Sequence, residues 1–160
     1  MLRFGILGAG RIGNVHARAI ASSGRAIASS GRATVGYIAD AMPEAAEKLA
    51  AVVGAKTASV EDIIASSDID AILIATPTDT HADLIEQAAR AGKAILCEKP
   101  VSLSVERIKA CLQVVEKAGV PLMIGFHRRY DPNFAALEKR LRSGEIGDPE
   151  IITITCRDPS

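Results

Sequence analysis

The chain has 160 residues and a mass of 16.8 kDa, which is the size of one domain. Its hydrophobic content of 48% and charged content of 24% are those of a globular protein and exclude a disordered or collagen-like chain. Its 19 basic and 19 acidic residues leave a net charge of zero, which predicts neither nucleic acid nor a membrane as a partner. The sequence has no run as apolar as a membrane helix and begins without a basic leader, so we expect a cytoplasmic protein.

The three cysteines are Cys97, Cys111 and Cys156. They are odd in number, far apart and without a C-x-x-C pair, so the sequence indicates no disulfide framework and no metal site. We expect reduced thiols.

The first 40 residues predict a strand, a glycine turn, a helix and a second strand. Residues 2–7 form a short apolar run that ends in Gly8-Ala9-Gly10-Arg11-Ile12-Gly13, after which the pattern becomes helical. Residues 33–39 form the second apolar run, and Asp40 closes it. The order of these elements is that of the first unit of a nucleotide-binding fold.

The rest of the chain alternates helices with strands. Helices are expected at 44–53, from 59, at 80–91, at 104–118 and from Asp131-Pro132 to Gly144, and strands at 56–58, 71–75, 94–97, 121–125 and 150–156. Such alternation predicts an α/β protein with a Rossmann-type, doubly wound and mostly parallel sheet. A single domain over 1–148 accounts for these elements, and the strand-like segment within 149–160 has no helix after it to cover it.

One segment is repeated. Residues 19–25 recur, residue for residue, as residues 26–32, a period too short for a solenoid repeat. Gly13 and Asp40 are 27 positions apart, and removing the seven-residue copy restores the spacing of about 20 that dinucleotide-binding domains show. The copy is therefore an insertion into the first unit, and we expect it to leave the helix as a loop.

The glycine turn has a physical rationale for binding a dinucleotide. Gly8 permits a tight turn, Gly10 lets the backbone approach a pyrophosphate, and Gly13 lets the helix pack closely on the strand. Arg11 and Ile12 lie in the same turn, where the helix N-terminus presents N–H groups to phosphates. The alternative is a glycine turn that only reverses the chain.

Asp40 is expected to accept hydrogen bonds from the adenosine ribose. Its carboxylate would repel a 2′-phosphate, so the sequence favours NAD over NADP. The alternative is an aspartate that caps the helix beginning near Pro43. Arg11 weakens the prediction of NAD, because a guanidinium near the adenosine tolerates a phosphate.

Four motifs resemble those of the Gfo/Idh/MocA oxidoreductases, in particular the inositol dehydrogenases among them. They are Gly8–Gly13, Thr76-Pro77-Thr78-Asp79-Thr80-His81, Gly92–Pro100 with its Glu98-Lys99-Pro100 element, and Gly125–Pro132 with its Arg-Arg-Tyr-Asp-Pro element. The resemblance implies the NAD-binding domain of an enzyme that transfers hydride between inositol, or a related polyol or sugar, and NAD.

The resemblance also implies roles for single residues. Lys99 matches a catalytic lysine that hydrogen-bonds the reacting hydroxyl, and Arg128 matches a position on the substrate side. Thr76, Pro77 and His81 match cofactor-binding positions, and Glu98, in the same element as Lys99, is also expected to bind the cofactor. A local capping or packing role for His81 stays open. His16 is expected to pack, and His127 has no assigned role.

The chain departs from the family at its end. Family members carry a second α/β domain with a proton-abstracting Asp and His in a D-x-x-x-H pattern, and the sequence stops at Ser160 before that region. We therefore expect the chain alone to be inactive, with residues 149–160 as the orphan first strand of that domain and a possible route to a homodimer. Two alternatives are an engineered, non-enzymatic scaffold that tests a duplicated segment, and an enzyme whose second domain comes from a partner chain.

Overall fold

A computed structural model of the chain describes residues 1–23, 32–155 and 157. The chain consists of two compact units, residues 1–125 and residues 126–160. The unit that contains the sheet ends at Gly125, and the domain boundary at 148 stays a prediction. The helix of the second unit, residues 132–142, has no buried residue.

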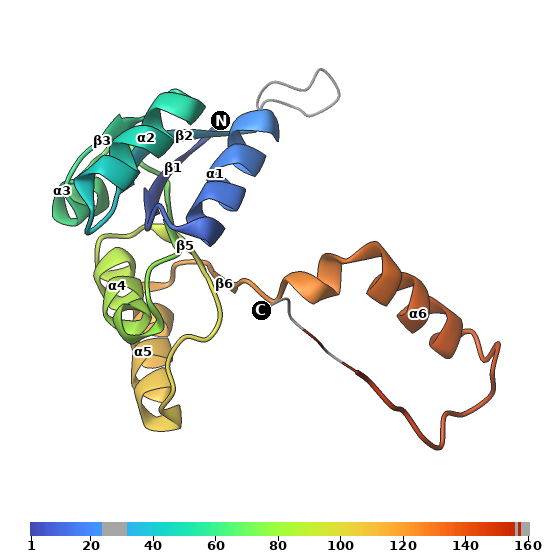
Figure 1. The fold of residues 1–160 in the computed structure, drawn as a ribbon. Helices are drawn as coiled ribbons and strands as arrows, with labels where there is room; N and C mark the ends of the chain where they lie inside the picture. Colours follow the sequence, from blue (N-terminus) through green and yellow to red (C-terminus); the bar gives the residue numbers. More distant parts are fainter. Residues whose placement is uncertain (24–31, 156, 158–160) are drawn as a thin grey trace. The chain divides into compact units, whose positions relative to one another are not determined.

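The first unit is built on a six-stranded sheet in the order β3-β2-β1-β4-β5-β6 (Figure 1). Every strand pair is parallel, which confirms the predicted doubly wound α/β fold. The strands are β1 (Leu2–Leu7), β2 (Ala33–Ala39), β3 (Lys56–Thr57), β4 (Ala71–Ile74), β5 (Ala94–Cys97) and β6 (Leu122–Ile124). β1 and β4 lie at the centre, so the chain reverses its direction of winding between them.

The helices of this unit connect successive strands. They are α1 (Arg11–Ser23), α2 (Pro43–Val53), α3 (Val60–Ala65), α4 (Thr78–Arg90) and α5 (Val105–Ala118). Local chemistry sets several ends: Pro43 occupies the first turn of α2, and the Ser104 hydroxyl accepts from the Arg107 N–H at 3.2 Å at the start of α5. Gly54 and Gly119 end α2 and α5 in the left-handed conformation.

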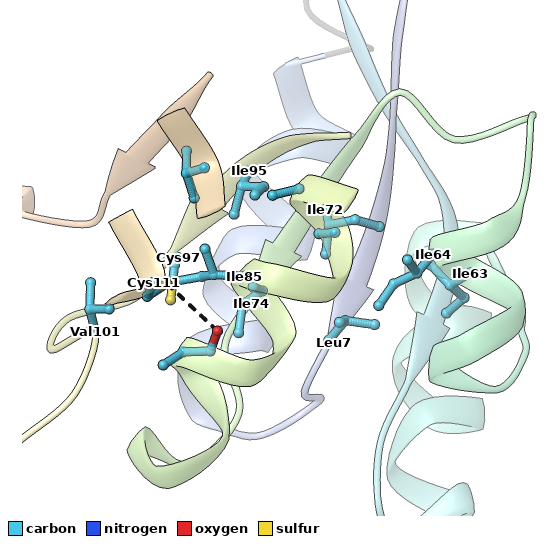
Figure 2. Close-up of a cluster of buried hydrophobic side chains, with 14 of the residues drawn as sticks. Leu7, Ile63, Ile64, Ile72, Ile74, Ile85, Ile95, Cys97, Val101 and Cys111 are labelled. Carbon is cyan, nitrogen blue, oxygen red and sulfur yellow. Dashed lines mark hydrogen bonds between the residues drawn. The ribbon is translucent and has the colours of Figure 1, made fainter. Parts of the chain in front are cut away.

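Side chains of the central strands alternate between two hydrophobic clusters, one on each face of the sheet. Ile72 and Ile74 of β4 belong to a cluster with residues of α3, α4 and α5, whereas Leu73 belongs to a cluster with residues of α1 and α2. All three side chains are buried, as expected for a strand covered on both faces, and Figure 2 shows Ile72 and Ile74 in the first of these clusters.

The cluster on the α4–α5 face contains two free thiols, Cys97 and Cys111 (Figure 2). Both are fully buried, and burial raises the pKa of Cys97 to about 12 and raises that of Cys111. A raised pKa keeps these thiols protonated at neutral pH, which makes them poor nucleophiles. The prediction for Cys156 lies outside the described residues.

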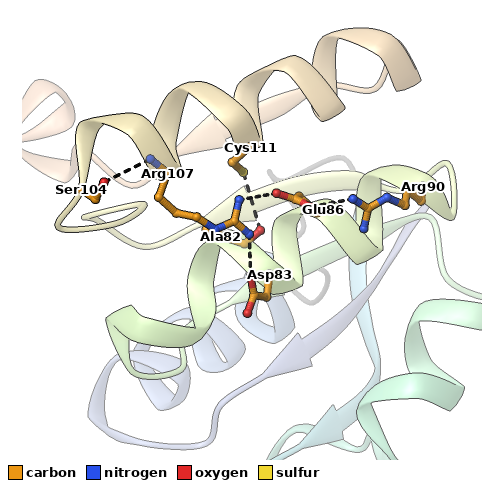
Figure 3. Close-up of polar contacts among 7 residues, drawn as sticks. All are labelled: Ala82, Asp83, Glu86, Arg90, Ser104, Arg107 and Cys111. Carbon is orange, nitrogen blue, oxygen red and sulfur yellow. Dashed lines mark hydrogen bonds and ion pairs between the residues drawn. The ribbon is translucent and has the colours of Figure 1, made fainter.

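An ion-pair network ties α4 to α5 on their outer side (Figure 3). The Arg107 guanidinium donates to the carboxylates of Asp83 and Glu86, and Glu86 also accepts from Arg90 at 2.6 Å. The hydrogen bond from Arg107 lowers the pKa of Glu86. The network therefore stabilises this helix pair at neutral pH, and the contribution of Glu86 is lost as the pH falls through its lowered pKa.

The second unit contains a short 3-10 helix, η1 (His127–Tyr130), and α6 (Pro132–Arg142). As predicted, the Asp131 carboxylate caps α6 by accepting from the Asn133 N–H at 2.8 Å, and Pro132 occupies its first turn. The structure assigns no strand to residues 150–155, where the sequence predicts one. A strand needs a partner for its ladder, and the apolar side chains here remain exposed, Ile151 at 88%.

α1 ends at Ser23, which belongs to the first copy of the repeated segment. The prediction that the second copy, residues 26–32, leaves the helix as a loop depends on residues 24–31, which lie outside the described residues. None of the helices among the described residues has the length and apolar character to cross a membrane.

Candidate functional site

The predicted site residues of the first unit gather at one edge of the sheet. Because all strands are parallel, their carboxyl ends meet at this edge, and ligands of open α/β sheets bind there at the point where the strand order reverses. Gly8–Gly13 follow β1, Asp40 follows β2, Thr76 and Pro77 follow β4, and Glu98 and Lys99 follow β5. The fold therefore brings together segments that are far apart in the sequence.

The glycine turn is packed so closely that two of its glycines have no room for a side chain. Gly8 has φ +100°, and a Cβ atom there would lie 2.5 Å from the carbonyl oxygen of Ala75. A Cβ atom at Gly13 would lie 1.9 Å from the carbonyl oxygen of Gly8. A Cβ atom at Gly10 would meet no atom within 4 Å. Gly10 thus leaves open space for a ligand, whereas Gly8 and Gly13 are required by the packing of strand, turn and helix.

The N-terminus of α1 is suited to an anion. The Asn14 N–H donates to the carbonyl of Gly10 at 2.9 Å, so the N–H groups of Arg11, Ile12 and Gly13 precede the intrahelical bonds of α1. The first turn contains no acidic residue, so no side chain of α1 itself offsets the positive end of the helix dipole. A space without a side chain at Gly10 and N–H groups beside it fit the pyrophosphate of a dinucleotide.

Asp40 lies directly beside this turn. Its carboxylate accepts from the Ala9 N–H at 2.6 Å and from the Met42 N–H at 2.8 Å. The N-cap of α2 is Met42 rather than Asp40, so the predicted alternative of a simple capping residue does not describe this contact. A carboxylate has about four acceptor sites, so Asp40 keeps capacity for ribose hydroxyls while it holds the turn.

A hydrogen bond that the sequence did not predict connects α1 with the end of β5. Nε2 of His16 lies 2.7 Å from Oε1 of Glu98, and both side chains are mostly buried. A Cβ atom at Gly125 would lie 3.0 Å from the same carboxylate, so the end of β6 also packs against it. The sequence held one signal for a role of His16 near the site, which is its position one helical turn after Gly13. A contact of Glu98 with the cofactor stays a prediction.

Thr76, Pro77 and His81 were predicted as cofactor-binding residues. Thr76 and Pro77 lie in the connection between β4 and α4 at the site edge, and the Thr76 hydroxyl lies 2.7 Å from that of Thr80. His81 is different, because its ring is 2% exposed and both of its nitrogens face backbone carbonyls. Both ring nitrogens are engaged by the protein itself, which favours the local role, and cofactor binding by His81 stays a prediction.

The two predicted catalytic residues belong to different units. Lys99 is exposed in the connection after β5, and its peptide bond to Pro100 is cis. Arg128 belongs to the second unit, where its guanidinium carbon lies 5.2 Å from the centre of the Phe134 ring. The predicted substrate role of Arg128 therefore stays a prediction, and His127, exposed in η1, gains no role.

Comparisons with known proteins agree with this geometry. A family model described as "Oxidoreductase family, NAD-binding Rossmann fold", the Gfo/Idh/MocA family, matches residues 2–126. Inositol 2-dehydrogenase from Rhizobium meliloti is 54% identical over 99% of this chain. The chain covers 46% of that protein, so it spans about half the length of this relative.

Solved structures of the same kind share the fold. A myo-inositol dehydrogenase from Corynebacterium glutamicum superposes with a TM-score of 0.80 and 40% identity over 92% of this chain and 43% of its own. A scyllo-inositol dehydrogenase from Lactobacillus casei, with NAD(H) and scyllo-inositol bound, has a TM-score of 0.81 and 29% identity over the same shares. Similarity to enzymes over almost the whole chain does not favour a non-enzymatic scaffold. The chain belongs to the Gfo/Idh/MocA oxidoreductase family and is an NAD-binding Rossmann domain closely related to the inositol dehydrogenases.

Proposed function

We propose that this chain is the cofactor-binding part of a dehydrogenase that transfers hydride between NAD and a cyclic polyol, with inositol or a related polyol or sugar as the substrate. The observation that carries the proposal is the common position of the glycine turn, Asp40 and Lys99 at one edge of the sheet. The relatives named for inositol oxidation support the substrate class.

The residues at this edge of the sheet have separate roles. The N-terminus of α1 binds the pyrophosphate, and Asp40 binds the adenosine ribose. When bound, NAD supplies the hydride acceptor. Lys99 extends from the end of β5, where an ammonium group orients the substrate hydroxyl and stabilises negative charge that develops on its oxygen. The hydrogen bond between His16 and Glu98 holds the residue before Lys99 against α1.

The reaction also needs a group that accepts the hydroxyl proton. The resemblance to the family assigns this step to a D-x-x-x-H pair, and none of the three histidines of this sequence has an aspartate four positions before it. An ammonium group that stays protonated donates but does not accept, so Lys99 does not replace the pair.

The 160-residue chain is therefore expected to bind NAD without oxidising myo-inositol at an ordinary enzymatic rate, for which about 10 per second is a median. Calorimetry with NAD and a steady-state assay of NADH formation test the two halves of this expectation. Turnover near that rate, abolished by Lys99→Ala, contradicts the assignment of the proton acceptor. Failure to bind NAD at all contradicts the proposed function itself.

Self-association through residues 151–155 is a further expectation. The segment Ile-Ile-Thr-Ile-Thr has high β-propensity and no charge, and Ile152 and Ile154 are 65% and 71% exposed. An unpaired segment of this kind pairs with a second copy. Sedimentation velocity over a concentration series is expected to show dimers or larger species.

A double variant, Ile152→Lys with Ile154→Lys, is expected to shift the distribution to monomers, because charge at an edge blocks pairing. Met42→Lys is the matched control, since Met42 is equally exposed at 66% but lies outside the segment. A single monomeric species at every concentration for the unmodified chain argues against this interface.

A further inference from the structure

His81 occupies an unusual position between two connections of the site edge. It lies in α4, and its ring is buried, 2% exposed. Nδ1 lies 2.7 Å from the carbonyl oxygen of Pro100, and Nε2 lies 2.8 Å from that of Thr76. One carbonyl belongs to the connection after β4 and the other to the connection after β5, next to Lys99.

The number of protons on the ring follows from counting donors. A backbone carbonyl oxygen only accepts, and a neutral imidazole has one N–H donor and one acceptor nitrogen. A neutral ring would therefore hold a nitrogen lone pair against a carbonyl lone pair at hydrogen-bond distance, in a place that water does not reach. Two N–H groups satisfy both contacts.

We propose that the buried His81 ring is protonated on both nitrogens at neutral pH and donates to the carbonyls of Thr76 and Pro100. In this way His81 acts as a positioning residue, which holds the connection after β5, with Lys99, against the connection between β4 and α4. The positioning part rests on the proposed function of Lys99, whereas the protonation state does not.

The surroundings contain charges of both signs. Hydrogen bonds from a cation to carbonyl dipoles are stronger than neutral ones and offset the cost of burial. The N-terminal end of α4 opposes a cation, and Asp79 in the first turn of α4 favours one. The other ionisable groups of α4 are Asp83, Glu86 and Arg90, and Asp83 and Glu86 are bound to Arg107. On the connection after β5, Glu98 and Lys99 precede Pro100. The hydrogen-bond geometry, not the net charge, supports the doubly protonated ring.

The nitrogen-15 shifts of the ring test the protonation state directly. In the labelled 160-residue chain at pH 7, long-range proton–nitrogen correlation from the carbon-bound ring protons is expected to place both His81 nitrogens in the protonated range. Scalar couplings across the hydrogen bonds to the carbonyl carbons of Thr76 and Pro100 are expected as well. His127, which is exposed, is an internal reference. Widely split nitrogen shifts, which mark a single neutral tautomer, overturn the proposal.

The positioning role is tested with His81→Gln, and His127→Gln is the matched control. In His81→Gln, amide exchange at Lys99 and at residues 101–103 is expected to accelerate at least tenfold, while the hydrogen-bonded amides of Gly8 and Ala9 in the glycine turn keep their protection. His127→Gln is expected to change neither. Unchanged exchange at Lys99 and at residues 101–103 overturns the positioning role. If His81→Gln does not fold, the spectrum of the unmodified chain still decides the protonation state of the ring. Absence of couplings from the ring nitrogens to the carbonyl carbons of Thr76 and Pro100 in that spectrum overturns the positioning role.

These measurements are independent of NAD. A chain that does not bind NAD contradicts the proposed function and leaves the ring spectrum unaffected. A chain that binds NAD and shows a neutral His81 ring retains the proposed function and overturns this inference.

Discussion

The Gly13→Ala substitution is expected to lower NAD affinity at least about 100-fold, the equivalent of losing two hydrogen bonds from N–H groups to charged phosphate oxygens. The added Cβ atom would lie 1.9 Å from the carbonyl oxygen of Gly8, and a backbone atom cannot rotate away from it. The N-terminus of α1 must therefore move off the turn, and its N–H groups no longer point at the pyrophosphate.

The same clash is expected to destabilise the chain without ligand. Overpacking of a tight contact costs about 1–3 kcal/mol, and a chain of this size loses about 2–4 °C of Tm for each kcal/mol. Calorimetry with NAD and thermal unfolding followed by circular dichroism measure the two effects. Unchanged affinity in a folded Gly13→Ala chain contradicts the role given to the turn.

Gly10→Ala is the control that separates binding from folding. A Cβ atom at Gly10 meets nothing within 4 Å, so the stability of the chain without ligand is expected to change by less than about 1 kcal/mol. NAD affinity is nevertheless expected to fall, because the methyl group occupies the space into which the pyrophosphate must come. If the Gly10→Ala chain binds NAD as tightly as the unmodified chain, the pyrophosphate does not occupy the space beside Gly10.

The second large effect is expected at Asp40, where the unmodified chain prefers NAD to NADP and Asp40→Asn reduces that preference at least about tenfold, or about 1.4 kcal/mol. The carboxylate would face the 2′-phosphate of NADP, and two like charges about 4 Å apart repel by about 4 kcal/mol at a protein surface. The amide removes the charge and keeps one acceptor oxygen. Calorimetric titration of both variants with both cofactors gives the ratio of dissociation constants.

The structural contacts of Asp40 require a second comparison. Its carboxylate also holds the N–H groups of Ala9 and Met42, so any substitution disturbs the turn itself. Such a disturbance lowers the affinities for NAD and NADP equally and leaves their ratio unchanged. A changed ratio is therefore specific to the 2′-position. Equal affinity of the unmodified chain for NAD and NADP contradicts the prediction and would point to Arg11 as a partner for the phosphate.

Most elements of this fold were predictable from the sequence because their signals are local. The buried strand β4 is apolar at every position, Pro43 and Pro132 stand in the first turns of α2 and α6, and Gly54 and Gly119 end helices. Each signal depends on neighbouring residues and on the conformations that a single residue adopts. The glycine turn is predictable for the same reason, since its three glycines lie within six residues between a strand and a helix.

The tertiary structure alone decided the partners of the polar groups at the site. His16 and Glu98 are 82 positions apart, Asp40 reaches Ala9 across 31, and His81 reaches Pro100 across 19. Periodicity and spacing carry no information about such contacts, because they arise only when parallel strands align their carboxyl ends at one edge. The same reason explains residues 150–155, whose β-propensity is plain in the sequence but which form no strand, since a strand exists only where another strand supplies its hydrogen bonds.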